Sequence, residues 1–164
     1  MGGEKVGGHR IPLPVGEKGL ARLGDAFVNL VYSTAKTKSM GAPQGEKVPD
    51  RVLSMALEIS RVPVPLRLTI GDRGDIVEAL LAYAWTNGLL GLDEAVEIIR
   101  AKIPMECFDS RSLEREAMAQ AFGALFKLAL RRIEEAGTQG EGSKPGRGGE
   151  EGEGGNVGGG VGDP

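Results

Sequence analysis

The chain has very little of what most metal centres and covalent catalytic sites are built from. Its 164 residues include one cysteine, Cys107, and one histidine, His9. An internal disulfide is therefore excluded, and zinc centres built from Cys and His, Ser-His-Asp triads and Cys-His pairs are close to excluded. A single cysteine also fits a reducing, cytoplasmic location. Any chemistry must rest on carboxylates, hydroxyls and lysines.

Long apolar runs and aromatic residues are scarce as well. The longest uninterrupted apolar run is the seven residues from Ala79 to Trp85, too short to span a bilayer. Residues 1–8 carry glycine and charge where a signal peptide has an apolar stretch. With 40% hydrophobic residues, the chain suits one domain with a real core, although aromatic residues make up only 4%.

Composition divides the chain into three parts. Residues 138–164 hold twelve glycines, no aromatic residue, and five acids against two bases, so we expect a disordered tail. Residues 1–15, with Pro12 and Pro14, indicate an extended arm. Residues 1–137 carry 18 acidic and 18 basic side chains, which argues against a large basic surface but not against a local one. We expect the folded domain over residues 16–137.

Helical periodicity dominates this middle part, and we predict an all-α fold. Apolar spacing predicts helices over residues 17–38, 51–61, 75–86, 93–103 and from 109 or 110 to 136. The first helix has an apolar stripe at Leu20, Leu23, Phe27, Leu30 and Val31, and Asp50 is the predicted N-cap of the second. The strand signal over residues 62–70 is broken by prolines, so we expect a loop there.

The helix that begins at Asp75 stands out because it is apolar on every side except for Asp75 and Glu78. An all-round apolar helix is buried, and two carboxylates spaced i, i+3 lie on one face of it. Buried ionised carboxylates without partners cost several kcal/mol each, on the order of 5, so a cation, a basic side chain or a shifted pKa is expected. A structural alternative makes Asp75 the helix N-cap and Glu78 a capping or salt-bridge partner of Arg73.

A second feature is Gly24 in the middle of the first predicted helix. A glycine costs roughly 1 kcal/mol relative to alanine there, which suggests close approach of another backbone. Asp25 follows it and could simply face solvent. Together with Asp75 and Glu78, however, it supplies the third carboxylate that a metal site on two helices requires.

These residues resemble a known family. Leu23-Gly24-Asp25-Ala26, followed some fifty residues later by Asp75-Ile76-Val77-Glu78-Ala79-Leu80-Leu81-Ala82 and Asn87-Gly88, resembles the endonuclease domain of ribonuclease III. The resemblance covers about residues 17–103, with residues 111–136 as a plausible closing helix. It looks closest to a compact, divergent, archaeal branch of the superfamily, without a double-stranded-RNA-binding domain.

The resemblance implies an all-helical homodimer that cleaves double-stranded or structured RNA with Mg²⁺ or Mn²⁺. Asp25, Asp75 and Glu78 would be the catalytic residues and the metal ligands, directly or through water, in a two-metal phosphodiester hydrolysis. Basic side chains could contact RNA phosphates, and the candidates are Lys36, Lys38, Lys47, Arg51, Arg61, Arg67 and Arg73.

The sequence also departs from the family pattern. The family glutamate four residues before the aspartate falls on Ala21, and the one seven residues before falls on Lys18, beside Glu17. Three hypotheses therefore stay open. The chain is a metal-dependent endoribonuclease, a catalytically weakened dimeric module that binds RNA or a ribonucleoprotein, or a helical interaction domain whose carboxylates only cap and bridge.

Overall fold

The computed structural model describes residues 13–140, so most of the predicted arm (1–15) and tail (138–164) lies outside the described residues. This part of the chain contains five α-helices, one short 3₁₀ helix and no strand, which confirms the predicted all-α fold. No helix within it is long and apolar enough to cross a membrane. The elements are α1 Lys18–Met40, α2 Asp50–Ser60, α3 Ile70–Thr86, α4 Leu92–Lys102, η1 Met105–Asp109 and α5 Arg111–Gly140.

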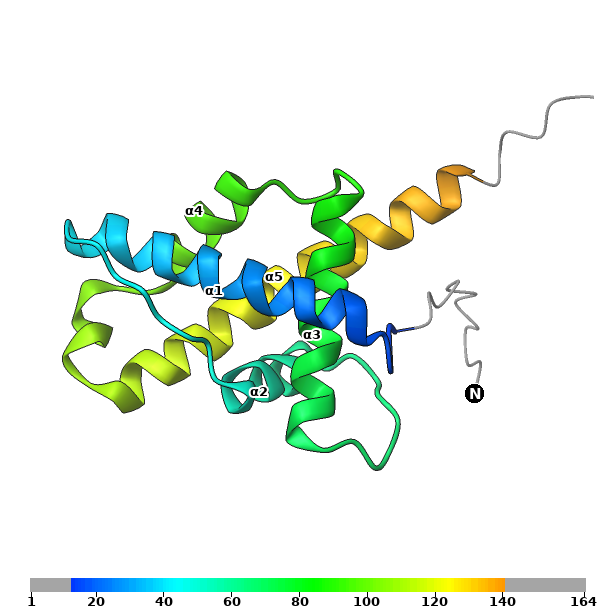
Figure 1. Cartoon of the computed structure of the whole chain (residues 1–164), viewed down its shortest axis with the longest axis horizontal. Coiled ribbons are helices and arrows are strands. Elements are labelled where there is room, and N and C mark those ends of the chain that lie inside the picture. The colour runs from blue at the N-terminus through cyan, green and yellow to red at the C-terminus, as the bar shows by residue number, and fades with distance from the viewer. Residues whose placement is uncertain (1–12, 141–164) are drawn as a thin grey trace, which may run out of the picture.

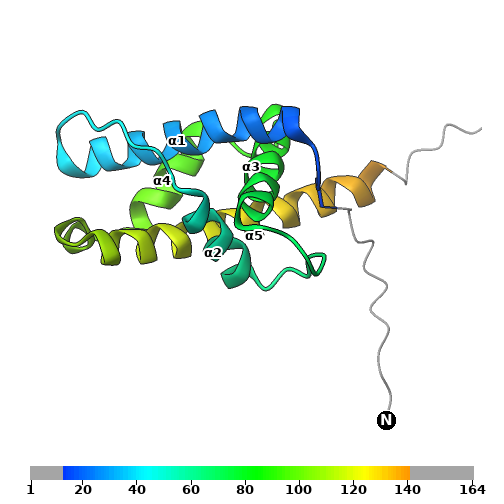
Figure 2. The ribbon, with the colours of Figure 1, turned by 60° about the horizontal axis from the view of Figure 1, so that its bottom comes forward.

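Helices α1, α2 and α5 pack against α3, and α4 packs against α1 and α5. Figure 1 shows α1 crossing in front of α3, with α5 running behind both. In Figure 2, α1 and α5 form two long sides with α3 and α4 between them, and α2 lies across α5. The seven residues 76–82 of α3 are all buried, so the predicted buried helix is confirmed. Its neighbour Tyr83 is 42% exposed, whereas Ala84 is fully buried, so Tyr83 lies on the outer face of the helix.

Two element boundaries differ from the sequence-based prediction. Helix α3 begins at Ile70, five residues earlier than predicted, because Thr69 caps it. The Thr69 hydroxyl accepts from the backbone of Asp72, and the Asp72 carboxylate accepts from the backbone of Thr69, forming a capping box. Asp75 is therefore not the N-cap and lies in the second turn. Helix α5 continues to Gly140, past the predicted start of the tail.

The buried side of α1 is also turned relative to the predicted stripe. Leu23 and Leu30 are 39% and 49% exposed, whereas the inward face carries Gly24, Phe27 and Val28. The cause is Gly24, which periodicity treats as neutral. A Cβ atom built on Gly24 would lie 2.0 Å from the carbonyl oxygen of Glu78. The predicted close approach of another backbone is therefore confirmed, and that backbone belongs to α3.

A ladder of side-chain hydrogen bonds holds the connection between α1 and α2, residues 41–49, along α1. Three polar side chains spaced four residues apart on α1 each bond the backbone of the connection, in the pairs Asn29–Val48 at 2.7 Å, Ser33–Glu46 at 2.9 Å and Thr37–Gln44 at 2.9 Å. Since residues four apart share one face of a helix, the connection is fastened along a full face of α1.

The packing at Gly24 yields a direct test. In Gly24→Ala the new methyl group would overlap the Glu78 backbone, so α1 and α3 must separate, at a cost of about 1–3 kcal/mol of unfolding free energy. Gly19→Ala is the matched control, because a Cβ at Gly19, also in α1, meets nothing within 4 Å. Thermal melts should show a lower Tm for Gly24→Ala only. Equal melting of both variants would contradict the close packing.

Candidate functional site

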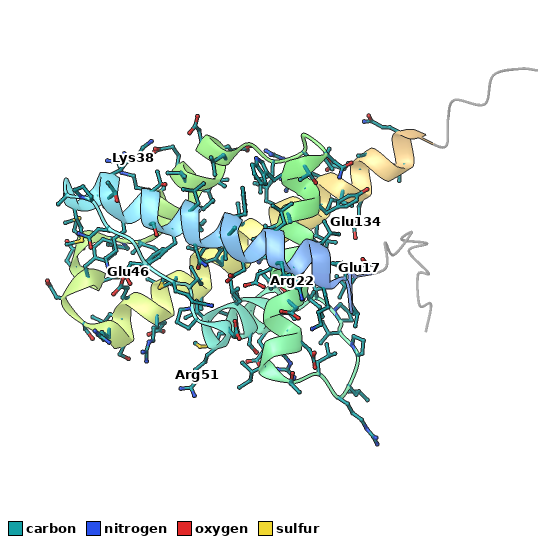
Figure 3. All side chains as sticks on the ribbon, viewed as in Figure 1. Glu17, Arg22, Lys38, Glu46, Arg51 and Glu134 are labelled. Carbon is teal, nitrogen blue, oxygen red and sulfur yellow. The ribbon has the colours of Figure 1, made fainter. Side chains whose placement is uncertain are left out.

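The three predicted site carboxylates line one cavity of about 320 Å³ where α1 crosses α3. Asp25 comes from α1, and Asp75 and Glu78 come from α3, one helical turn apart. Figure 3 labels Arg22, another lining residue, on the stretch of α1 that passes in front of α3. The complete lining consists of Lys18, Ala21, Arg22, Asp25, Lys47, Asp50, Asp75 and Glu78.

The sequence analysis missed the fourth carboxylate of this cavity, Asp50. It was interpreted as the N-cap of the second helix, but Pro49 occupies the cap position and Asp50 is the first residue of α2. No side-chain capping bond forms there. Asp50 packs beside the acidic end of α3, because the position of a Cβ on Gly74, directly before Asp75, lies 3.6 Å from the Asp50 Cα, an ordinary van der Waals distance. No local sequence signal marks this contact.

Glu78 is the least solvated of the four acids. It is 4% exposed, and none of the described residues donates a hydrogen bond to its carboxylate or forms an ion pair with it. Burial, and after it the negative charges of Asp25, Asp50 and Asp75, raise the pKa of Glu78 to about 8, although the positive charge of Lys47 opposes the rise. A cation beside Glu78 would therefore stabilise the ionised form of its carboxylate.

The other predicted ligands have basic or polar partners. The Lys18 ammonium bonds the Asp75 carboxylate at 2.5 Å. The Asn29 amide donates to Asp25 at 3.2 Å, and Lys47 lies 3.9 Å from the same oxygen. The alternative pairing of Glu78 with Arg73 does not form.

Arg73 instead turns away from the cavity. Its guanidinium donates to the Glu58 carboxylate on α2 at 2.5 Å. The structural alternative for the acidic pair is therefore wrong on two counts, since Asp75 caps no helix and Glu78 bridges no arginine.

The donor set suits a hard divalent cation. Carboxylate oxygens are the ligands that Mg²⁺ and Mn²⁺ prefer, and Glu78 offers a buried carboxylate with no partner among the described residues. In residues 13–140 no three Asp, Glu, His or Cys side chains are placed to hold one ion together. Magnesium commonly keeps several waters and takes only one or two carboxylates, and the cavity has room for such waters. The residues therefore fit an ion held by few direct ligands.

The predicted RNA contacts are dispersed over the molecule. Lys38 pairs with Glu97 at 3.1 Å, and Arg73 pairs with Glu58. Arg51 is exposed at the start of α2, where Figure 3 shows it pointing away from the ribbon. Of the seven predicted RNA contacts, only Lys47 lines the carboxylate cavity.

Lys36 has a structural environment. It is 8% exposed, and its ammonium bonds the carboxylates of Glu46 and Glu114, both at 2.7 Å. The Tyr32 hydroxyl donates to the same Glu114 carboxylate. Together these contacts join α1 to α5 and to the connection before α2. The positive charge of Lys36 is thus largely balanced by carboxylates of the protein itself.

A second, more basic cavity of about 400 Å³ adjoins the first. Lys47 lines both cavities. Among the described residues, Arg111 and Arg115 of the second cavity form no salt bridge. Its charged lining consists of Lys36, Lys47, Arg111 and Arg115 against Glu46 and Glu114, so positive charge is in excess.

The chain matches the model of a known protein family. The family model described as Ribonuclease III matches residues 18–135, which span both acidic helices and most of α5. No curated protein matches the chain.

The pKa of Glu78 predicts how stability should change with pH. Because the pKa in the folded state lies above the ordinary value of 4.5, folding takes up a proton, and this group lowers stability as pH rises from 4.5 to about 8. Glu78→Gln removes the penalty. Without divalent ions, we expect the free energy of unfolding of this variant to exceed that of the wild type at about pH 9, by a few kcal/mol at most. At about pH 5 the two free energies should be equal. Thermal melts at the two pH values measure this difference.

Magnesium should reverse this order if Glu78 binds the ion. Binding to the folded state alone raises Tm, so the wild type should gain more from Mg²⁺ than Glu78→Gln does. Glu116→Gln, an exposed acid on α5, is the matched control and should follow the wild type throughout. If the Tm difference between Glu78→Gln and the wild type changes neither with pH nor with Mg²⁺, the assignment of Glu78 is contradicted.

Proposed function

The chain belongs to the ribonuclease III family, and on that premise we propose that it is a metal-dependent endoribonuclease acting on double-stranded or structured RNA. The observation that carries the proposal is the buried Glu78 carboxylate, which faces a cavity with three further carboxylates and has no partner among the described residues. Stability does not explain this arrangement, because an unpaired buried carboxylate lowers the free energy of unfolding and a neutral side chain at position 78 would not.

The proposed chemistry is two-metal hydrolysis of a phosphodiester. When bound, Mg²⁺ or Mn²⁺ supplies an activated water and positive charge against the phosphate. Glu78 would be a direct ligand, and Asp25 and Asp75 would act directly or through water. These three residues remain a proposed ligand set, supported by their common cavity.

Neighbouring side chains orient the proposed ligands. Asn29 donates to Asp25 and accepts from the backbone N–H of Val48, so it fixes Asp25 relative to the connection that carries Lys47. Lys18 holds Asp75 at the rim and balances its charge. Lys47 is placed where it can attract a phosphate towards the acids, because it lines both the acidic and the basic cavity.

The proposed substrate is RNA because the family acts on double-stranded RNA and because a basic cavity continues from the acidic one. Lys47, Arg111 and Arg115 are the strongest proposed phosphate contacts. Arg51 is a further one on the exposed surface. Lys36, Lys38 and Arg73 are weaker candidates, since each is already paired with a carboxylate. The single cysteine supports a cytoplasmic site of action.

Two observations favour the alternative of a catalytically weakened RNA-binding module. Ala21 brings a methyl group to the cavity lining, and the Lys18 ammonium occupies one side of Asp75. Both features reduce the carboxylate oxygen available to a cation. The interaction-domain hypothesis has less support, because Glu78 neither caps nor bridges.

An endonuclease assay separates these alternatives. The full chain should cut end-labelled duplex RNA in Mg²⁺ or Mn²⁺ and not in EDTA, and Glu78→Gln should abolish cutting while Glu116→Gln retains it. Single-stranded RNA of the same sequence is the substrate control. Salt-sensitive binding of duplex without cleavage would select the weakened module, and neither binding nor cleavage would overturn the RNA assignment.

We also propose that the protein forms a homodimer, supported by the exposed apolar residues of α1. Leu23 and Leu30, seven residues apart, lie on one face of that helix and remain 39% and 49% exposed. Gly24 does not contribute to this proposal, because its close contact lies within the chain.

Sedimentation tests the dimer. An obligate interface should bury more than roughly 2,000 Å² in total, so the wild type should sediment as a dimer at tens of micromolar. The double variant Leu23→Gln with Leu30→Gln should become monomeric without losing helix content. A wild type that is monomeric under these conditions would overturn the proposed dimer.

A further inference from the structure

The carboxylate cavity has a gap on α1 and an additional acid on α2. Ala21, where the family pattern has a glutamate, is 4% exposed and contributes a methyl group to the lining. Asp50 contributes a carboxylate to the same lining from a different helix. The cavity therefore still has four carboxylates, although one of them comes from an unexpected position in the chain.

Contacts on both sides of Asp50 place the start of α2 beside this cavity. On the α3 side, the position of a Cβ on Gly74 lies 3.6 Å from the Asp50 Cα, an ordinary van der Waals distance, so the Asp50 backbone packs next to the residue that precedes Asp75. In the connection before α2, the Asn29 side chain accepts a hydrogen bond from the backbone N–H of Val48, two residues before Asp50.

Asp50 is an exposed acid in the first turn of α2, where a negative charge favours the helix. It makes no side-chain capping bond, and no ion pair or side-chain hydrogen bond to it is found among residues 13–140. Its carboxylate lines the same cavity as Glu78, and its negative charge, like those of Asp25 and Asp75, raises the pKa of Glu78.

We propose that Asp50 is a metal-site carboxylate that replaces, from α2, the ligand that Ala21 cannot supply from α1. This inference rests on the proposed metal-dependent function. Two independent observations carry it, namely the shared cavity and Glu78, a residue only 4% exposed whose carboxylate lines that cavity without a partner among the described residues. The ligand is a hard divalent cation such as Mg²⁺ or Mn²⁺.

The test is a double-mutant cycle on metal affinity. Binding of Mn²⁺ is measured by calorimetry for the wild type, Asp50→Asn, Ala21→Glu and the double variant. Asp50→Asn should weaken binding by about tenfold or more. Ala21→Glu in the Asp50→Asn background should recover most of that loss, whereas in the wild-type background it should gain much less. This dependence on background is the signature of replacement.

Matched controls separate the metal role from helix stability. Asp93→Asn removes an exposed aspartate from the first turn of α4, as Asp50→Asn does from α2, and should lower Tm by a similar small amount without changing Mn²⁺ affinity. Asp50→Glu keeps the charge and should retain most of the binding.

The outcomes distinguish this inference from the proposed function. If the wild type binds Mn²⁺ and cuts RNA but Asp50→Asn behaves like Asp93→Asn, the role of Asp50 is overturned and the nuclease stands. If the wild type neither binds Mn²⁺ nor cuts, both proposals fall. Loss of affinity in Asp50→Asn that Ala21→Glu does not recover would make Asp50 a ligand in its own right and overturn the replacement.

Discussion

The structure depends on the contact between α1 and α3 at Gly24 and Glu78. The Glu78 carbonyl fills the space that any other residue at position 24 would need for its Cβ. This contact sets the distance between the two acidic helices, and with it the spacing of Asp25 from Asp75 and Glu78. Packing and site geometry thus have one origin. The same residue supplies a backbone contact to the core and a carboxylate to the cavity.

A second constraint is electrostatic. Four carboxylates share one cavity. Two cations of its lining form ion pairs, Lys18 with Asp75 and Lys47 with Asp25. Glu78 has no partner among the described residues. The fold tolerates this because the penalty is concentrated on one group, whose pKa rises to about 8. A mobile cation can relieve it, whereas a fixed side chain would fill the cavity.

Local signals and tertiary signals differ in how far the sequence reveals them. The apolar run of α3 predicted its burial, and Gly24 in a helix predicted a close backbone, because both are properties of one segment. The start of α3 was misplaced because Thr69 and Asp72 form their capping box just after a proline-rich loop. Asp50 was missed because it shares the cavity with Asp75 and Glu78, which follow it in the chain by 25 and 28 residues, and no local pattern predicts that contact. The exposure of Leu23 and Leu30 likewise depends on a long-range contact, that of Gly24 on α1 with Glu78 on α3.

The ladder between α1 and residues 41–49 changes how this connection should evolve. Surface connections usually accept insertions and deletions, because few contacts specify their length. Here a side chain in each of three successive turns of α1 hydrogen-bonds the connection, and the bonded positions in the connection are two residues apart. These bonds fix the length of the connection. One added or lost residue would shift Lys47 and Asp50 out of register together. We therefore expect length in this segment to be as restricted as sequence is in a core.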